Sequence, residues 1–324
     1  MGGSGFIGTR LCRRLTEHQS QFSIVDKAES AHYREKVERA DVRSVEALRD
    51  AVPEGSVLIN LAAEHRDDVR PKSLYDEVNV ADARNLCQVA REKRIQHIVF
   101  TSSVAVYGFA PAGTDESGEI NYFNDYGRTK WLAEGVFKEW QAEDPDNRTL
   151  VIVRPTVVFG EQNRGNVYNL LRQIASGKFV MIGDGKNTKS MAYVENVAAF
   201  LEHSLTFKPG VHIHNYIDKP DFDMNTLVGT VRKKLGKGAS VGLRLPYVAG
   251  LACGYTFDAM GAITRRSFPV SSIRVKKFCA TTQFATNIAD TGFEPPLPLA
   301  ESLERTLQHE FLEDHQEERV FFTE

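Results

Sequence analysis

Apolar runs alternate with amphipathic segments through the first half of the chain. Residues 57–63 and 95–103 are largely apolar, which is typical of strands buried on both faces of a parallel sheet. Residues 73–93 and 126–142 have the spacing of helices. Strands that alternate with helices in this way predict βαβ units with right-handed crossovers. The pattern therefore predicts an α/β fold with a doubly wound parallel sheet.

The chain opens on a glycine-rich turn that leads into a predicted helix over residues 6–17. Gly2, Gly5 and Gly8 are spaced three apart. Glycine permits the tight turn, and the backbone N–H groups at the start of the following helix can bind a pyrophosphate. The third glycine lets that helix pack closely against a strand. This arrangement is typical of a Rossmann-like dinucleotide site.

An acidic residue follows the three glycines at the sequence spacing expected for a contact with the adenosine ribose. The apolar run 22–25 ends in Asp26, 18 residues after Gly8. An acid at this position accepts from the ribose 2′-hydroxyl and repels a 2′-phosphate, so we expect NAD as the cofactor and not NADP. Asp41 precedes a predicted helix over residues 44–51. It could accept from the adenine amino group or cap that helix.

A tyrosine and a lysine share one face of the helix predicted over residues 126–142. Tyr126 and Lys130 are four residues apart, and Ser103 ends the preceding predicted strand. A free phenol ionises near pH 10, so it needs a lowered pKa to act as a base at neutral pH. A nearby ammonium and a positive nicotinamide ring would both lower that pKa. We predict that Ser103, Tyr126 and Lys130 act together on a substrate hydroxyl.

Four segments together carry a family resemblance. They are Gly2-x-x-Gly5-x-x-Gly8, residues 101–108 (TSSVAVYG), Tyr126-x-x-x-Lys130 and residues 154–160 (RPTVVFG). On these motifs the chain resembles the extended short-chain dehydrogenase/reductases, within them the sugar-nucleotide epimerase/dehydratase branch. The resemblance implies that Ser103, Tyr126 and Lys130 are catalytic. The cofactor contacts it implies are Gly2, Gly5, Phe6, Ile7, Gly8, Asp26, Asp41, Val42, Leu61, Ala62, Ala63, Asn79, Tyr126, Lys130 and Pro155.

The residues at the end of the strand before the predicted catalytic helix differ between the dehydratases and the other enzymes of this branch. Dehydratases of the family carry Thr-Asp-Glu where this chain has Ser103-Val104-Ala105. Without the acid pair no group remains there to protonate a leaving hydroxyl, so dehydration is disfavoured. Related reductases usually take NADP, which Asp26 argues against. The resemblance therefore implies a redox-neutral 4-epimerisation through a transient 4-keto sugar, with Tyr126 taking the C4 hydroxyl proton and NAD⁺ the hydride.

A narrower resemblance concerns the substrate. Its segments are residues 62–69 (AAEHRDDV), 163–171 (NRGNVYNLL), 189–194 (KSMAYV) and 271–284 (SSIRVKKFCATTQF). They resemble bacterial 4-epimerases that convert N-acetylglucosamine to N-acetylgalactosamine on undecaprenyl diphosphate for O-antigen and lipopolysaccharide biosynthesis. The alternatives are a UDP-glucose or UDP-N-acetylglucosamine 4-epimerase and, in another class, a non-catalytic NAD-binding sensor protein.

The family also places an apolar strand directly before the first glycine, whereas only Met1 precedes Gly2 here. That strand lies at the sheet centre, between the strands that end at Asp26 and Ala63. Each buried backbone group left unsatisfied without it costs about 1–3 kcal/mol. We therefore expect that Met1 is not the natural start and that about eight to ten residues precede it, enough for one strand.

The chain divides in this scheme into a NAD-binding region, residues 1–156, and a smaller substrate-binding lobe, residues 157–324, partly interleaved with the sheet. Either diphosphate substrate needs cationic or amide donors. Our candidates are Arg164, Asn166 and Arg274, each of which could equally be an ordinary surface residue. His65, just after the strand end at Ala63, could be a second acid or base or, more simply, a loop histidine with a structural hydrogen bond.

Residues 245–263 are apolar apart from Asp258 and are flanked by basic residues, among them Arg244, Lys276 and Lys277. We expect a buried helix or helix pair here. The functional alternative is a patch that contacts anionic lipid peripherally on the cytoplasmic face of the inner membrane.

Net charge, cysteine content and the N-terminal sequence exclude some classes of protein. With 40 basic and 43 acidic residues the net charge is −3, and nothing in that balance suggests a nucleic-acid partner. Four scattered cysteines and the absence of a His/Cys cluster predict reduced thiols in a cytoplasmic protein and no metal site. The apolar core of a signal peptide is missing from the N-terminus. By analogy with the family we expect a homodimer.

Overall fold

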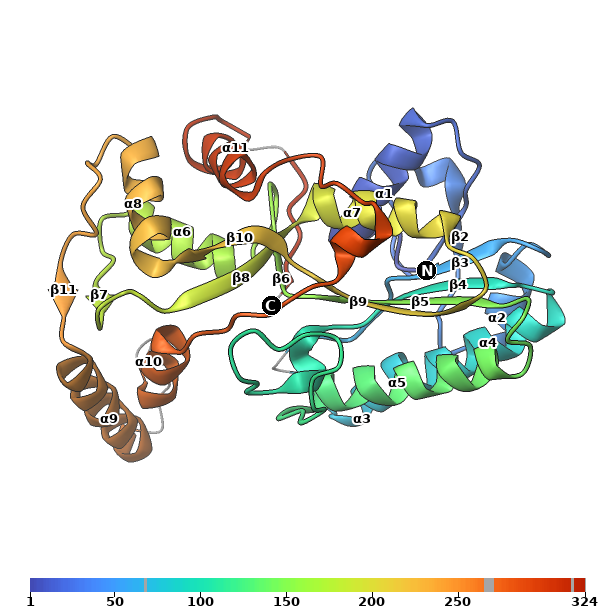
Figure 1. Ribbon diagram of the computed structural model, residues 1–324, viewed down its shortest axis with the longest axis horizontal. Coiled ribbons are helices and arrows are strands. Elements are labelled where there is room, and N and C mark those ends of the chain that lie inside the picture. The colour runs from blue at the N-terminus through green and yellow to red at the C-terminus, as the bar shows by residue number, and fades with distance from the viewer. Residues whose placement is uncertain (67–68, 265–270, 316–317, 324) are drawn as a thin grey trace.

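The computed structural model describes residues 1–66, 69–264, 271–315 and 318–323. A parallel four-stranded sheet forms the larger lobe, in the order β3-β4-β5-β9 (Figure 1). Its strands are β3 (Val57–Asn60), β4 (His97–Thr101), β5 (Thr149–Pro155) and β9 (Gly210–Tyr216). A second parallel pair, β1 (Ile24–Asp26) and β2 (Val37–Arg39), extends this layer. The predicted α/β parallel sheet is therefore confirmed.

Met1 and Gly2 lie between β1 and β3. The Met1 amino group donates to the Ile59 carbonyl at 2.6 Å, and the Leu61 N–H donates to the Met1 carbonyl at 3.0 Å. On the other side the Gly2 N–H donates to the Val25 carbonyl at 3.1 Å. These two residues thus occupy the position where the sequence predicts the central strand.

Two strands are shorter than predicted. The strand predicted over residues 57–63 ends at Asn60, because the Asn60 carboxamide oxygen accepts from the Ala62 N–H at 3.0 Å and turns the chain out of the sheet. The strand predicted over residues 95–103 is β4, His97–Thr101. In both cases the apolar run continues beyond the hydrogen-bonded ladder.

Helices cover both faces of this sheet (Figure 1). Alternate residues of β4 serve the two faces: Ile98 and Phe100 pack in one core with helices α2, α4 and α5, and Val99 packs in another with α1 and α7. The bounds are α1 (Phe6–Glu17), α2 (Val45–Ala51), α4 (Asp82–Glu92), α5 (Asp125–Ala142) and α7 (Val194–His203). The predicted helix over 6–17 is confirmed to the residue, and that over 126–142 begins one residue earlier.

The helix predicted over residues 73–93 is continuous but not uniform. It begins as α3 (Ser73–Tyr75), passes through a π-helical segment (Asp76–Ala81) and continues as α4. π-Helical turns are rare and frequently lie at functional sites. Here the π segment carries Asn79, one of the predicted cofactor residues.

The smaller lobe is built around its own three-stranded sheet, in the order β10-β8-β6, with a short β7–β11 pair at its outer end. The apolar faces of α6, α8 and α11 meet on this sheet in one core. The elements are β6 (Val157–Phe159), β7 (Met181–Ile182), β8 (Thr188–Tyr193), β10 (Asp218–Asp223), β11 (Arg244–Leu245), α6 (Asn166–Ala175), α8 (Met224–Lys234), α9 (Tyr247–Thr264), α10 (Ser272–Cys279) and α11 (Leu299–Phe311).

The two halves of the sequence are interwoven. β9 and α7 follow residue 156 in the chain, yet β9 pairs in parallel with β5, and the apolar side of α7 packs in the same core as α1. The boundary proposed at residue 156 stays a prediction.

Candidate active site and cofactor-binding edge

The glycine-rich turn has the geometry that its residue types predicted. Gly2 has φ +73°, and a Cβ there would lie 2.8 Å from the Ala62 nitrogen. At Gly8 a Cβ would lie 2.5 Å from the Gly3 Cα and 2.6 Å from the Gly2 carbonyl oxygen. α1 begins directly after Gly5, its first turn carries no acid, and no side chain caps it. The helix N-terminus is therefore suited to an anion such as a pyrophosphate.

Asp26 ends β1 beside this turn. One carboxylate oxygen accepts from the Ser4 N–H at 3.0 Å and the other from the Ala28 N–H at 2.9 Å. These bonds fix the carboxylate at the carboxyl end of the sheet, where the sequence predicts the ribose contact. The ribose contact of Asp26 stays a prediction.

Asp41 does not cap α2. Ser44 is the N-cap and accepts from the Ala47 N–H at 3.2 Å. Asp41 instead binds the Arg43 guanidinium at 2.6 Å, and this bond holds the pKa of Asp41 below its usual value. The capping alternative is thus wrong, and the adenine contact, like that of neighbouring Val42, stays a prediction.

The loop after β3 carries Leu61, Ala62 and Ala63 past the glycine-rich turn. Asn79 holds this loop: its carboxamide oxygen accepts from the Glu64 N–H at 2.8 Å, and its nitrogen donates to the Glu64 carbonyl at 2.9 Å. The same nitrogen donates to the Thr129 hydroxyl of α5 at 2.9 Å. Asn79 therefore links the predicted cofactor loop to the helix that carries Tyr126 and Lys130.

Ser103, Tyr126 and Lys130 come together as predicted. Ser103 follows β4 and caps a 3₁₀ turn (Val104–Tyr107), and its hydroxyl is hydrogen-bonded to that of Tyr126. Asn124 caps α5 by accepting from the Gly127 N–H at 2.8 Å, which places Tyr126 in the first turn of the helix. The Lys130 Nζ lies 6.0 Å from the centre of the Tyr126 ring and donates to the Thr101 carbonyl at 2.7 Å.

Burial dominates the electrostatics of this group. It raises the pKa of Tyr126 to about 12, while the Ser103 hydrogen bond acts in the lowering direction. For these side chains by themselves the pKa of Tyr126 is therefore raised, and the lowering predicted for Lys130 together with a positive nicotinamide ring stays a prediction. Burial also lowers the pKa of Lys130 to about 8, against the raising influence of Asp82 and Glu134. Lys130 is thus an ammonium at pH 7, and a positive nicotinamide ring would be the remaining influence that lowers the pKa of Tyr126.

A buried ion pair beneath the catalytic residues was missed from the sequence. Glu134 and Arg154 are 0% and 2% exposed at their side chains, and the guanidinium binds both carboxylate oxygens, at 2.9 and 2.6 Å. Glu134 also accepts from the Ser102 hydroxyl at 2.6 Å, next to Ser103. The spacing in the sequence could have pointed to Glu134, because it lies four residues after Lys130 and eight after Tyr126 and so shares their face of α5.

The predicted substrate contacts are dispersed over the smaller lobe. Arg164 pairs with Glu310 at 2.8 Å and lies over the Tyr168 ring at 4.1 Å. Asn166 is the exposed first residue of α6, and Arg274 is exposed on α10. His65 hydrogen-bonds the backbone of Ala63 and of Thr323, which favours its structural alternative. Pro155, a predicted cofactor contact, is the buried last residue of β5.

An open pocket of about 780 Å³ lies between the β7–β11 pair and helices α9 and α10. Its lining combines the cationic Arg244 and Lys276 and one acidic side chain, Asp184, with the apolar Ile182, Pro246 and Tyr247. A pocket of this composition suits a ligand that has both an anionic and an apolar part.

Comparison with known proteins identifies the family of the chain. The pattern of the NAD dependent epimerase/dehydratase family matches residues 1–216. The N-acetyl-alpha-D-glucosaminyl-diphospho-ditrans,octacis-undecaprenol 4-epimerase of Escherichia coli O157:H7 is 47% identical over 328 residues, covering 100% of this chain and 98% of that protein. A UDP-glucose 4-epimerase of Vibrio cholerae is 29% identical over 208 residues, 60% of this chain and 62% of that protein.

Solved structures show the same fold. MoeE5 in complex with UDP-glucose and NAD aligns with TM-score 0.71 at 20% identity, covering 95% of this chain and 96% of that chain. The UDP-glucuronic acid 4-epimerase of Bacillus cereus in complex with NAD aligns with TM-score 0.68 at 17% identity, with the same coverage. Together with the match over residues 1–216, these findings confirm the predicted family. The chain belongs to the NAD dependent epimerase/dehydratase family.

Proposed function

We propose that this protein is an isomerase, an NAD-dependent 4-epimerase that interconverts N-acetylglucosamine and N-acetylgalactosamine on undecaprenyl diphosphate. The observation that supports it most is the 47% identity to the Escherichia coli O157:H7 epimerase along the whole chain. That similarity includes the smaller lobe, where the substrate-specific contacts of this fold are expected. The Vibrio cholerae UDP-glucose epimerase matches only 60% of the chain, which makes a UDP-sugar the second candidate.

The residues of the site divide the work of the reaction. Tyr126 takes the proton of the C4 hydroxyl and returns it, and Ser103 holds the same hydroxyl in place. The Lys130 ammonium stabilises the phenolate electrostatically, from 6.0 Å above the ring. Bound NAD supplies the hydride acceptor and donor at C4, held by the glycine-rich turn and Asp26. Val104 and Ala105 leave no acid to expel a hydroxyl, which supports epimerisation over dehydration.

Direct turnover of the two candidate donors tests this function. The purified protein is incubated with N-acetylglucosaminyl-diphospho-undecaprenol and, separately, with UDP-N-acetylglucosamine, and C4 inversion is followed by chromatography of the released sugar. We expect turnover of the lipid-linked donor and at most slow turnover of the nucleotide sugar. Turnover of the UDP-sugar alone would replace this proposal with the second candidate.

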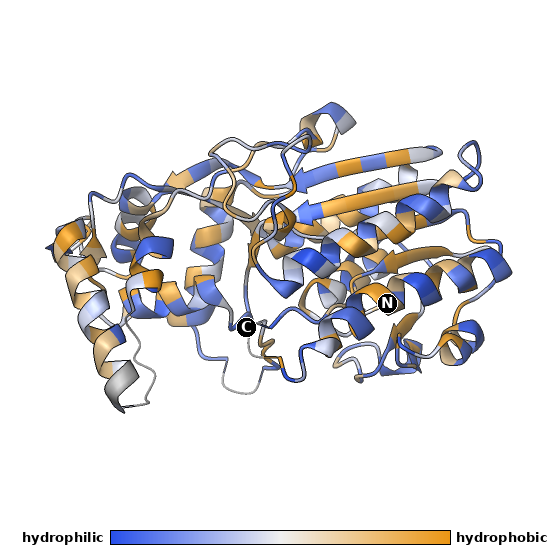
Figure 2. Ribbon diagram, turned by 90° about the horizontal axis from the view of Figure 1, so that it is seen from below, coloured by the Kyte–Doolittle hydropathy of each residue, from blue (hydrophilic) through white to orange (hydrophobic). Residues whose placement is uncertain are grey.

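We further propose that α9 and α10 rest on a lipid surface, where such a substrate resides. The buried helix pair that we expected here is exposed: Val248 is 77% exposed, Tyr255 52% and Ile273 53%. α9 stands at the outer end of the smaller lobe with apolar residues along its length (Figure 2). Lys276, in the last turn of α10, lies beside it with its Nζ 5.5 Å from the centre of the Tyr255 ring, whereas Lys277 lies over the Phe123 ring. An apolar helix with a cation next to it suits an anionic membrane surface.

Within the described part of the chain no helix is both long and apolar enough to cross a bilayer. The contact we propose is therefore peripheral, and the homodimer expected from the family stays a prediction.

Sedimentation with vesicles tests the membrane contact. We expect the protein to bind vesicles containing phosphatidylglycerol more tightly than neutral ones. Val248→Glu should weaken that binding at least about fivefold, because it removes about 1 kcal/mol of apolar burial and adds a repelled charge. Val57→Glu is the matched control, since Val57 is 45% exposed at the start of β3, far from α9. Equal binding by both variants would contradict the contact.

A further inference from the structure

The last described segment of the chain, residues 318–323, lies against the lobe that carries the glycine-rich turn. We call it the C-terminal strap. Phe321 is only 9% exposed, and its ring centre lies 5.8 Å from that of Phe6, the first residue of α1. Phe322 is 71% exposed. Phe321 therefore packs on the start of α1, whereas its neighbour Phe322 does not. The N-terminus of α1 is the predicted pyrophosphate site.

Backbone bonds fix the strap to the loop between β6 and α6. The Phe321 N–H donates to the Gln162 carbonyl, and the Arg164 N–H donates to the Phe321 carbonyl, both at 2.8 Å. The Thr323 hydroxyl donates to the Asn163 carboxamide oxygen at 2.9 Å. The same loop is held by α1, because Arg10 donates to the Gln162 side chain at 3.0 Å. The loop, α1 and the strap thus form one hydrogen-bonded unit.

The strap also reaches two loops at the carboxyl edge of the parallel sheet. Arg319 donates to the Glu29 carbonyl at 2.9 Å, three residues beyond Asp26. The backbone of Thr323 hydrogen-bonds the imidazole of His65, two residues beyond Ala63. Together with Phe6, these contacts join the strap to the turns after β1 and β3 and to the glycine-rich turn. These three segments carry part of the predicted NAD contacts, among them the glycines, Asp26 and Ala63.

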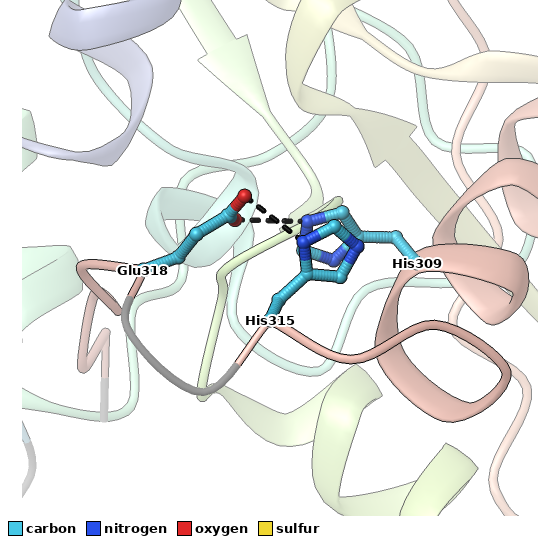
Figure 3. A group of neighbouring side chains, drawn as sticks. All are labelled: His309, His315 and Glu318. Carbon is cyan, nitrogen blue, oxygen red and sulfur yellow. Dashed lines mark hydrogen bonds and ion pairs between the residues drawn. The ribbon is translucent and has the colours of Figure 1, made fainter.

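A charged clip fastens the near end of the strap to α11 (Figure 3). Glu318 binds the His309 Nε2 and the His315 Nδ1, each at 3.0 Å, and the two imidazole rings stack at 3.8 Å. The second nitrogen of His315 faces Glu313 at 2.9 Å. The three ligand atoms lie within 4.8 Å of one another, as in a metal site. Because both nitrogens of His315 already face carboxylates, we interpret the cluster as a hydrogen-bonded clip.

We propose that the C-terminal strap is a positioning element that holds the cofactor loops in place and slows the release of NAD. The strap is bonded to the turns after β1 and β3 and packs on the start of α1. Because these segments are held together, they cannot easily move apart, and a bound dinucleotide needs them to move apart in order to leave. An epimerase that regenerates its cofactor in every cycle benefits from such retention. The proposal rests on the family's use of NAD and not on the lipid-linked substrate.

Release of NAD from two single variants tests the proposal. The NAD-loaded protein is mixed with excess unlabelled NAD, and loss of radiolabelled NAD gives the dissociation rate constant. Phe321→Ala removes the contact with Phe6 and should raise this rate constant at least about fivefold, the lower end of the range for coupling between sites. Phe322→Ala, at the exposed neighbouring position, should leave the rate constant unchanged. An unchanged rate constant in Phe321→Ala would overturn the proposal.

A second variant covers the case in which Phe321→Ala does not fold. Glu318→Gln keeps the shape of the clip but removes its charge from the surface, where Glu318 is 39% exposed. It should also speed NAD release, by a smaller factor. Because coupling between two binding events is reciprocal, NAD should in turn slow hydrogen exchange of residues 319–323 in the unmodified protein. No protection on NAD addition would overturn the proposal, whereas failure of the unmodified protein to bind NAD would instead contradict the cofactor.

Discussion

Tyr126→Phe is expected to lower kcat at least about 10³-fold, within the range by which positioned acid–base groups contribute to catalysis. Phenylalanine fills the same half-buried site at the start of α5 and keeps the ring beneath the Lys130 ammonium. It lacks the hydroxyl that is hydrogen-bonded to Ser103, so no group remains to take the C4 proton. Turnover of the accepted donor, measured by chromatography at saturating substrate, gives the decrease.

NAD binding separates this chemical role from a structural one. The affinity for NAD, followed by quenching of protein fluorescence, should change by less than about threefold, well under 1 kcal/mol. Tyr122→Phe is the matched control: Tyr122 lies four residues earlier and is 40% exposed. It should retain the activity of the unmodified protein. Full activity in Tyr126→Phe would refute the assignment of the base.

Arg154→Met is expected to destabilise the fold by about 3–5 kcal/mol, because it removes the guanidinium bound to both oxygens of the buried Glu134 carboxylate and leaves that carboxylate with the Lys138 ammonium at 3.7 Å. Glu134 is fully buried, and Arg154 binds both of its oxygens. Arg154 also donates to the Tyr107 hydroxyl at 2.6 Å, so the change removes a second buried bond. Urea unfolding followed by circular dichroism measures the loss as a lower midpoint.

An exposed pair of the same chemistry provides the control. Arg91 and Glu143 are bonded at 2.5 Å but are 44% and 42% exposed. Arg91→Met should cost less than about 1 kcal/mol, because water screens the pair and solvates the carboxylate that remains. Replacing Arg154 and Glu134 together with apolar residues should recover much of the loss. If Arg154→Met lowers the free energy of unfolding no more than Arg91→Met does, then burial does not explain the contribution of the Arg154–Glu134 pair.

Tyr126→Phe and Arg154→Met test two different roles of residues on α5. Tyr126, Lys130 and Glu134 follow one another at four-residue intervals along α5. The first is the proposed base, whereas the third binds Arg154 and Ser102 beneath the strand ends. We therefore expect Tyr126→Phe to leave stability almost unchanged and Arg154→Met to affect stability first.

Features encoded over short stretches of sequence were predicted well. The glycine spacing located α1 to the residue, and the Tyr126-x-x-x-Lys130 spacing located α5 and the catalytic group. Strand ends were predicted too far along the chain, because apolar composition reports burial and does not report where the hydrogen-bonded ladder stops. Asp41 was left between two roles, and only the position of Ser44 showed which residue caps α2.

Contacts between distant segments could not be predicted. The pKa of Tyr126 depends on how deeply the phenol is buried, which the i, i+4 spacing to Lys130 does not report. The apolar run 245–263 was expected in a core, yet α9 is exposed, because apolar composition alone cannot tell a buried helix from an exposed one. The strap was visible only as a charged tail ending in two phenylalanines.

By itself the sequence determined the α/β fold, the NAD-type glycine turn and the family, because each depends on residue types at short fixed spacings. It also named Ser103, Tyr126 and Lys130 as candidates, and their catalytic roles stay a prediction. The tertiary structure decided which groups share a buried environment. It brought Arg154 to Glu134 across 20 residues and Phe321 to Phe6 across 315. Those pairings arise from the packing of whole lobes, which the local spacing of residue types does not encode.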